Sequence, residues 1–479
     1  MLRIAIIGGG TSGLSAAYHL DRQKRAGSSL EYVVYERAPQ AGGVLRSERV
    51  AGCLLEAGPD SFLTEKPWAL ALCRELGLSD QIIGSNDAQR KTYIVVRNRL
   101  VRMPDGLMFM VPTKIWPMVF TSLFSWSTKA RIVQEYFCRP QTLAGDESVA
   151  AMVHRHFGAE MVDRVADPLL SGIYGADADV LSARTVLPRF VEMEQKYGSL
   201  SRGMLAARRR MAEVTGNRPK PPLFSSLKEG MQQLVDALLA RLDARAFCLG
   251  REVEQVQFTG SEWVVTAADA RDRFDSVVMA TPAHVAGHLL AGQDADLAEE
   301  LSGISYSSSV IVSLIFERKQ LDRIAGADGF GFLVPRSECR RVRAATFVHN
   351  KFPHRVPEEL GIVRCALGGL RDEAAWQMSD EEVLRTVKDE LFEILGISAG
   401  PRAARIYRWR RAMAQPFPGH LERLARIDRR LERLPGLALA GNYFRGIGVP
   451  DAIRTGQEAA ERTSSQHSAL RSQQNLSSH

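Results

Sequence analysis

The distribution of apolar residues at the amino terminus predicts a strand, a helix and a second strand. Residues 4–7 are a continuous apolar run typical of a buried strand, and residues 15–20 follow with the spacing of a helix. Residues 31–36 form another largely apolar run, which ends in Glu36. Strands that alternate with helices are typical of a parallel sheet, so the chain opens as an α/β fold.

Later segments contain further elements of both kinds. Periodicity predicts an amphipathic helix at residues 230–238, and strands are expected at residues 251–258, 263–268 and 274–280. A second group of apolar runs predicts strands at residues 310–316 and 362–367, beside a helix at residues 380–395. This mixture of sheet and helix indicates an α+β arrangement for the chain as a whole.

Two segments differ from the rest in composition. Residues 90–222 are predominantly helical by periodicity and end in a proline-rich run, residues 218–222, that is typical of a linker. Residues 464–479 are polar, rich in Ser and Gln and poor in apolar anchors. This tail is therefore expected to be disordered.

Gly8, Gly10 and Gly13 form a G-x-G-x-x-G motif between the first predicted strand and the helix. Gly8 allows a sharp turn, Gly10 lets backbone N–H groups approach a pyrophosphate, and Gly13 lets the helix pack closely on the strand. The pyrophosphate would lie at the positive end of that helix. Glu36, about twenty residues further on, can accept hydrogen bonds from both hydroxyls of an adenosine ribose. A glycine-rich turn followed by an ordinary strand-terminal Glu is the alternative, and this spacing disfavours it.

Two more glycine-containing segments suit a long cofactor. Gly42 and Gly43 permit a second close approach of the backbone. Residues 437–451 read as a strand, a glycine-rich loop and the start of a helix, with Pro450 and Asp451 in its first turn. With the first motif, these segments resemble the flavin-containing amine oxidase superfamily. The runs at residues 56–62, 167–176, 329–335 and 441–451, in this order, resemble the oxygen-dependent protoporphyrinogen oxidase family over roughly residues 3–463.

The resemblance implies FAD as the cofactor, held non-covalently because no Cys or His lies in a flavin-attachment motif. The late helix would point its N-terminus at the flavin and stabilise negative charge on the reduced ring. The residues expected to bind FAD are Gly8, Gly9, Gly10, Thr11, Ser12, Gly13, Glu36, Arg37, Gly42, Gly43, Val44, Gly58, Pro59, Asp60, Ser61, Val253, Asn442, Ile447, Gly448 and Val449.

Because the flavin motifs lie near both ends of the chain, the FAD-binding domain must be assembled from discontinuous segments. We expect a Rossmann-like FAD-binding domain from residues 1–89, 223–301 and 416–463. Residues 90–222 would form a helical, membrane-associating cap insertion, and residues 302–415 a mixed α/β substrate-binding domain.

The resemblance also implies the reaction. Three successive two-electron oxidations of a porphyrinogen each reduce FAD, and O2 reoxidises the flavin with release of H2O2. We expect protoporphyrinogen IX to be oxidised to protoporphyrin IX in haem biosynthesis, because only a small cationic cluster near Arg90 is evident for substrate carboxylates. Coproporphyrinogen III, with four propionates instead of two, is the alternative.

Three residues are candidates for positioning the substrate. Family members place a propionate-binding arginine near Arg90, although the aligned position here is Thr92, and a surface role for Arg90 is the alternative. Asp60 could orient the pyrrole N–H groups or only cap its turn. Gly172 matches a glycine that lines the substrate cavity, where a missing side chain lets a flat macrocycle approach. No acid–base pair is evident; His154 and His156 are expected to be surface or packing residues.

Residues 100–137 are rich in Met, Phe and Trp and are interrupted by three prolines. This segment could lie in a membrane interface, with Trp116 and Trp126 at headgroup level and Lys114, Lys129 and Arg131 near anionic lipid. Helices that roof an apolar substrate cavity are the alternative. No stretch has the eighteen or so uninterrupted apolar residues of a spanning helix, and the first strand begins by Arg3, so we expect a cytoplasmic protein peripheral to the membrane.

The composition of the chain argues against several classes of protein. The chain has 479 residues, 45% of them hydrophobic, which suits two or three globular domains. Its net charge of +7 is spread among interleaved acids, and no basic stripe or module indicates nucleic-acid binding. Six cysteines without C-x-x-C or histidine partners predict free thiols and no metal.

Other functions remain open at this stage. An amine oxidase, a carotenoid desaturase or a non-catalytic FAD-binding scaffold could share the opening motif, but the first needs an aromatic pair that is not evident and the second lacks the late glycine loop in this form. Besides the tetrapyrrole and O2, the expected partners are a membrane surface, a ferrochelatase and a second copy of the chain in a homodimer.

Overall fold

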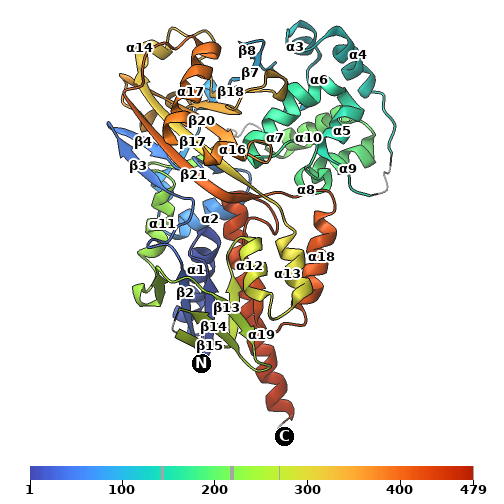
Figure 1. The fold of residues 1–479 in the computed structure, drawn as a ribbon. Helices are drawn as coiled ribbons and strands as arrows, with labels where there is room; N and C mark the ends of the chain where they lie inside the picture. The colour runs from blue at the N-terminus through green and yellow to red at the C-terminus, as the bar shows by residue number, and fades with distance from the viewer. Residues whose placement is uncertain (142–144, 216–220, 269, 478–479) are drawn as a thin grey trace.

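The computed structural model describes residues 1–141, 145–215, 221–268 and 270–477, and it arranges them in two tiers (Figure 1). The lower tier in Figure 1 contains α1, β2 and both chain termini. The upper tier contains a large sheet with β17 and β20, and a group of helices lies beside that sheet.

A five-stranded parallel sheet forms the centre of the lower tier. Its strands, in spatial order, are β12 (Phe247–Leu249), β2 (Leu30–Glu36), β1 (Leu2–Ile7), β16 (Ser276–Met279) and β22 (Leu437–Leu439). The strands come from three distant parts of the chain. The strands β1, β16 and β22 are almost wholly buried, as expected for a parallel sheet covered on both faces, whereas no residue of the edge strand β12 is fully buried. The helix α1 (Thr11–Arg25) connects β1 to β2 and packs against α19 (Val449–Ser477).

Smaller elements complete the lower tier. A three-stranded antiparallel sheet consists of β13 (Gln255–Phe258), β14 (Trp263–Ala267) and β15 (Ala270–Phe274). The first two agree with predicted strands, whereas β15 was not predicted. The surrounding helices and short strands are α2 (Pro67–Glu75), α11 (Gln232–Leu239), α12 (Ala283–Leu290), α13 (Ala295–Ser302), α18 (His420–Leu431), β5 (Phe62–Leu63), β6 (Ile82–Gly84) and β11 (Phe224–Leu227). The hairpin of β3 (Ser47–Val50) and β4 (Cys53–Glu56) lies beside the upper sheet, where Cys53 and Leu55 pack against Ile315.

A seven-stranded sheet forms the upper tier. Its order is β21 (Ala403–Ala414), β17 (Tyr306–Glu317), β20 (Leu360–Gly368), β19 (Ala344–Phe347), β18 (Gly331–Leu333), β7 (Thr92–Val96) and β8 (Arg99–Arg102). All neighbours are antiparallel except β18 and β7. The helix α17 (Asp380–Leu395) has the predicted bounds, begins with a capping box of Ser379 and Glu382, and buries Val383, Val387 and Leu391 against this sheet. The short helices α14 (Arg318–Leu321), α15 (Val348–Lys351) and α16 (Ala374–Gln377) flank it.

The hairpin of β7 and β8 corrects the expectation of a helical segment from residue 90. Residues 92–96 are β-branched or aromatic, and the connecting Arg97 and Asn98 both have positive φ, 51° and 60°, as in a tight hairpin turn. The hairpin joins the seven-stranded sheet because β7 pairs with β18, more than two hundred positions away in the chain. Pairing at that sequence distance leaves no local periodic signal.

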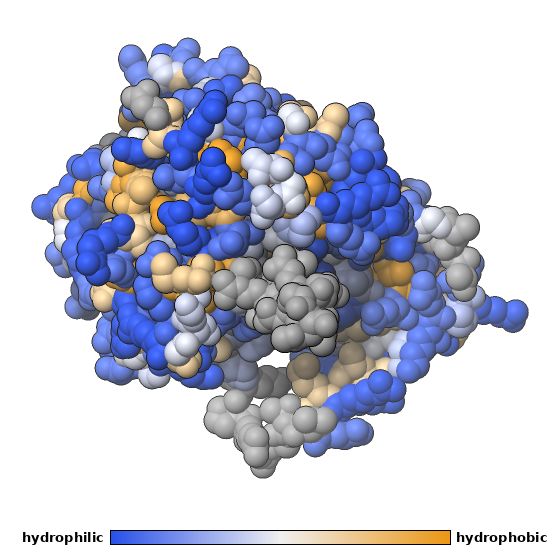
Figure 2. Space-filling view, turned by 90° about the horizontal axis from the view of Figure 1, so that it is seen from below, coloured by the Kyte–Doolittle hydropathy of each residue, from blue (hydrophilic) through white to orange (hydrophobic). Residues whose placement is uncertain are grey.

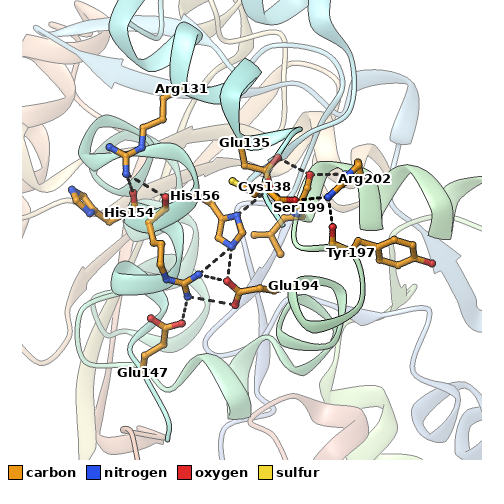
Figure 3. Close-up of polar contacts among 12 residues, drawn as sticks. Arg131, Glu135, Cys138, Glu147, His154, His156, Glu194, Tyr197, Ser199 and Arg202 are labelled. Carbon is orange, nitrogen blue, oxygen red and sulfur yellow. Dashed lines mark hydrogen bonds and ion pairs between the residues drawn. The ribbon is translucent and has the colours of Figure 1, made fainter. Parts of the chain in front are cut away.

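The rest of the predicted insertion is mainly helical and is called the helical cap, residues 107–215. It contains β9 (Leu107–Met108), β10 (Val111–Pro112), α3 (Ile115–Phe120), α4 (Trp126–Glu135), α5 (Val149–Phe157), α6 (Ala159–Met161), α7 (Asp167–Tyr174), α8 (Ala183–Val186), α9 (Pro188–Tyr197) and α10 (Leu200–Thr215). These helices enclose an apolar core of their own, together with a buried polar cluster around His156 (Figure 3). No helix within the described ranges is long and apolar enough to cross a membrane.

The carboxyl terminus differs from the expected disordered tail. The helix α19 begins inside the lower tier, where Ile453, Ala460 and Thr463 are buried, and it continues to Ser477. Extending an established helix avoids the cost of nucleation, so a polar sequence can continue one. The expected linker at residues 218–222 lies largely outside the described residues, as do the last two residues of the tail. The face of the molecule that carries the termini is largely hydrophilic (Figure 2).

Candidate functional site

The predicted dinucleotide loop lies between β1 and α1, and its three glycines have different surroundings. A Cβ on Gly8, whose φ is +107°, would lie 2.6 Å from the carbonyl oxygen of Ala280, and one on Gly13 would lie 1.9 Å from that of Gly8. These two glycines permit close packing. A Cβ on Gly10 would meet nothing within 4 Å. Gly10 also precedes the first turn of α1 without a side-chain cap, which leaves open space and N–H donors where a pyrophosphate fits.

Glu36 ends β2 beside this loop. Its carboxylate accepts hydrogen bonds from the backbone N–H of Gly9 at 2.6 Å and of Ala38 at 2.8 Å. The backbone N–H of Arg251 donates to the carbonyl oxygen of Glu36 at 3.0 Å, which brings the segment of Val253 to the same end of the sheet. The fold therefore brings together the residues expected at the adenosine end, whereas Arg37 is exposed.

The second glycine pair lies directly against the first loop. The N–H of Gly42 donates to the carbonyl oxygen of Gly9 at 2.8 Å, and a Cβ on Gly43 would lie 3.3 Å from the Cα of Gly10. A Cβ on Gly58 would lie 2.1 Å from the carbonyl oxygen of Val44. The three glycine segments thus form one continuous surface, and at each of these contacts the missing side chain permits close approach.

The late glycine loop leads into α19, where Ile447 and Gly448 precede Val449. Asn442 donates from its side chain to the carbonyl oxygen of Ala412 at 2.8 Å. At the start of the helix, Asp451 is buried and forms an ion pair of 2.5 Å with Lys66, which follows the Gly58 turn in the chain. An acidic side chain in the first turn suits the positive end of the helix.

Asp60 lies at the turn of residues 58–61 and forms a buried ion pair with Lys351 of α15. The ammonium Nζ lies 3.0 and 2.9 Å from the two carboxylate oxygens and 3.2 Å from the hydroxyl of Ser61. Burial raises the pKa of Asp60, but Lys351 and Arg364 outweigh it and hold that pKa well below its usual range. The carboxylate is thus engaged by a cation, and its expected role of orienting pyrrole N–H groups stays a prediction.

Two arginines join the same turn. Arg364 of β20 donates to the carbonyl oxygen of Gly58 at 2.5 Å, and Arg355 donates to that of Asp60 at 3.2 Å. Arg355 is fully buried and pairs with Glu56 at 3.1 Å. Burial raises the pKa of Glu56 to about 7. We call these five side chains, Glu56, Asp60, Lys351, Arg355 and Arg364, the turn cluster.

The other two candidate substrate residues lie apart from the turn cluster in the chain. Arg90 is half exposed and pairs with Asp87 at 3.6 Å, on the turn before β7. Gly172 lies on the exposed side of α7, where a Cβ would meet only Leu333 at 3.6 Å. Two residues on, burial together with the charge of Asp451 raises the pKa of Tyr174 to about 12.

Sequence reasoning missed Lys351, Arg355 and Arg364. Lys351 lies 291 positions from Asp60 in the chain, and its ammonium is 4.7 Å from the ring centre of Phe224. Its local sequence gives little signal, because Lys351 follows the polar His349 and Asn350 and only Phe352 after it is aromatic.

Comparison with known proteins gives consistent results. The coproporphyrinogen III oxidase of Bacillus subtilis is 31% identical over 463 residues, which cover 95% of this chain and 96% of that protein. Protoporphyrinogen oxidase 2 of Arabidopsis thaliana is 28% identical, over 96% of this chain and 93% of that protein. A crystal structure from Exiguobacterium sp. 255-15, provisionally described as a protoporphyrinogen oxidase, superposes with a TM-score of 0.84 at 26% identity, over 96% of this chain and 98% of that one.

The comparisons also bear on the cofactor. Putrescine oxidase shares the fold with a TM-score of 0.70 at 19% identity, over 97% of this chain and 99% of that one. The dinucleotide loop, Glu36 and the open space at Gly10 fit the ADP half of a flavin dinucleotide, and FAD is the cofactor of this chain. The flavin containing amine oxidoreductase family matches residues 11–463, and the chain belongs to that family.

Proposed function

We propose that the protein oxidises a porphyrinogen to the corresponding porphyrin, using its FAD as hydride acceptor and O2 to reoxidise the flavin with release of H2O2. The observation that carries this proposal is the continuous surface formed by the loops at Gly10, Gly43 and Gly58, which suits an extended FAD that ends beside the turn cluster. The flavin supplies the redox chemistry when bound. The chain's own residues bind the cofactor and set the charge around it.

Among the substrates, we propose coproporphyrinogen III ahead of protoporphyrinogen IX. The sequence argument for protoporphyrinogen relied on Arg90 as the main cation, but its guanidinium pairs with Asp87 at the surface. The relatives from Bacillus subtilis and Propionibacterium freudenreichii, 31% and 32% identical, are both named coproporphyrinogen III oxidase. Protoporphyrinogen IX remains the second candidate, supported by the name of the Arabidopsis relative.

The deciding experiment compares the two substrates. The protein is incubated aerobically with each porphyrinogen, and porphyrin fluorescence and peroxide are followed together. We expect porphyrin formation with three peroxides per porphyrin, and a higher kcat/KM for coproporphyrinogen III. A higher kcat/KM for protoporphyrinogen IX would reverse the substrate order, and oxidation of neither would reject the proposal. An anaerobic sample with substrate separates an enzyme from a flavin-binding scaffold, because only an enzyme bleaches its flavin.

We further propose that the exposed aromatic side chains of α3 and α4 contact a membrane surface. Trp116, Phe120 and Trp126 are each more than 70% exposed, and the rings of Trp116 and Phe120 stack at 6.1 Å. The ammonium of Lys129 lies 4.4 Å from the ring centre of Trp126, which puts a cation beside these rings. Exposed Trp beside Lys suits an anionic lipid interface.

A further inference from the structure

The turn cluster contains more positive than negative charge in a mostly buried place. Three cations, Lys351, Arg355 and Arg364, face two carboxylates, Glu56 and Asp60. Lys351 and Asp60 are only 11% and 13% exposed, and Arg355 is fully buried. Charges with little access to water interact strongly with their surroundings. One positive charge of the cluster is therefore without a compensating carboxylate within it.

The hydrogen bonds of the two arginines show where the uncompensated positive charge of the turn cluster lies. Arg355 and Arg364 donate to the carbonyl oxygens of Asp60 and Gly58, so both arginines lie against the backbone of the turn. Each also has a buried Nε without a hydrogen-bond partner among the described residues. Since a Cβ on Gly58 would lie 2.1 Å from the carbonyl oxygen of Val44, the turn is packed onto the Gly42–Gly43 loop of the dinucleotide site. The excess charge thus adjoins the surface proposed for FAD.

Reduction of a flavin creates the charge that such a site would stabilise. A hydride carries two electrons and one proton from the substrate carbon to the ring, so the reduced ring gains one negative charge until it accepts a second proton. Fixed positive charge nearby favours that anion over the neutral oxidised ring.

We propose that Lys351 and Arg364 are positioning residues that favour the reduced, anionic state of the flavin, and that Asp60 opposes them while holding Lys351 in place. The proposal rests on the proposed placement of the flavin ring beside residues 58–61. It explains why a lysine is buried against Asp60, although a neutral pair of similar size would avoid the cost of desolvating two charges.

The test measures properties of the bound flavin and not catalytic turnover. Its result therefore does not depend on which porphyrinogen the protein oxidises. Two quantities are determined for the FAD-bound protein: the midpoint potential by reductive titration, and the dissociation constant of the sulfite adduct, in which an anion adds to the ring. For Lys351→Met we expect about tenfold weaker sulfite binding and a lower midpoint potential, by about 30 mV for each tenfold in the two-electron equilibrium. Lys351→Arg should restore both values.

The variant Asp60→Asn removes a negative charge and should therefore shift both quantities in the opposite direction. Loss of the carboxylate should raise the potential and tighten the sulfite adduct, measured near pH 6 so that the unpaired Lys351 keeps its proton. If Asp60 and Lys351 had only a structural role, removing either one would disturb the site in the same way. The two variants would then not shift the midpoint potential in opposite directions. Arg364→Met should change both quantities as Lys351→Met does, and it replaces that variant if Lys351→Met loses FAD.

Arg273→Met, which removes an exposed arginine paired with Glu262, is the matched control. The proposal would be overturned if the midpoint potential shifted in the same direction in Lys351→Met and Asp60→Asn, or if it shifted in neither variant.

Discussion

The Nδ1 atom of His156 lies 3.1 Å from Oε1 of Glu135, although both side chains are almost completely buried between α4 and α5. The other ring nitrogen, Nε2, lies 3.0 Å from Oε1 of Glu194 on α9 (Figure 3). An imidazolium can donate from both nitrogens, and the pKa of each of the two carboxyl groups is lowered, so the arrangement favours the charged ring. Glu194 also pairs with Arg155, which in turn reaches Glu147. His156 is therefore a packing residue, as expected, whereas His154 is exposed.

The pH dependence of cap stability follows from this arrangement. Burial lowers the pKa of His156, but the bonds to Glu135 and Glu194 outweigh it, so the pKa is raised above 6.5. A raised histidine pKa contributes stability that is complete below the unfolded value and is lost as pH rises through the folded value. We expect His156→Leu to cost about 3–5 kcal/mol at pH 6, because the buried Glu135 loses its cation and Glu194 keeps only Arg155.

Urea unfolding from about pH 6 to about pH 9 measures this difference. The difference in the free energy of unfolding between the wild type and His156→Leu should become smaller as pH rises. His154→Leu, on the same helix but exposed, should change stability by less than about 0.5 kcal/mol. A gap that stays constant over this range would show that the ring is neutral in the folded protein.

Substitution Gly10→Val should abolish FAD retention without unfolding the protein. The backbone of Gly10 is extended, and an added side chain would point into open space that the pyrophosphate is expected to occupy. We expect a colourless protein with an unchanged circular dichroism spectrum. Gly400→Val is the matched control, since Gly400 is also open and lies in the exposed loop between α17 and β21. Stoichiometric flavin in Gly10→Val would show that this loop has another use.

The wild-type protein should bind one FAD per chain non-covalently. Precipitation with acid should release all of the flavin into the supernatant, because the expected contacts at Gly10 and Glu36 are polar and not covalent. Absorbance of both fractions measures the release. Flavin that remains with the precipitate would contradict the non-covalent attachment.

Membrane contact is tested by replacing Trp116 and Trp126 together with Ser. We expect the wild type to cosediment with anionic vesicles and the double variant to bind at least about tenfold more weakly, since each Trp loses apolar area that the interface would bury. Phe392→Ser removes an aromatic side chain that is 56% exposed on α17 and should not change binding. Equal sedimentation of the wild type with and without vesicles would favour the alternative that these helices only roof the cavity.

Much of the lower tier could be predicted because its signals are local. The apolar runs at β1 and β2 and the glycines between them follow from the period of a strand and from the backbone freedom of glycine. The bounds of α17 also agree with its periodicity and its capping box. By contrast, β7 was assigned to a helical segment. It forms a local hairpin with β8, but its place in the seven-stranded sheet depends on pairing with β18, which is distant in the chain.

The sequence by itself determined the dinucleotide loop, the family and the cofactor, because each depends on residue types within short motifs and on the order of those motifs. Only the tertiary structure decided which charges meet. Lys351 reaches Asp60, and His156 reaches Glu135 and Glu194, because sheets and helices bring distant parts of the chain together. An ion pair has no sequence period, and its strength depends on burial that the complete fold creates. The charge around the flavin and the pH response of the cap are therefore properties of the folded chain.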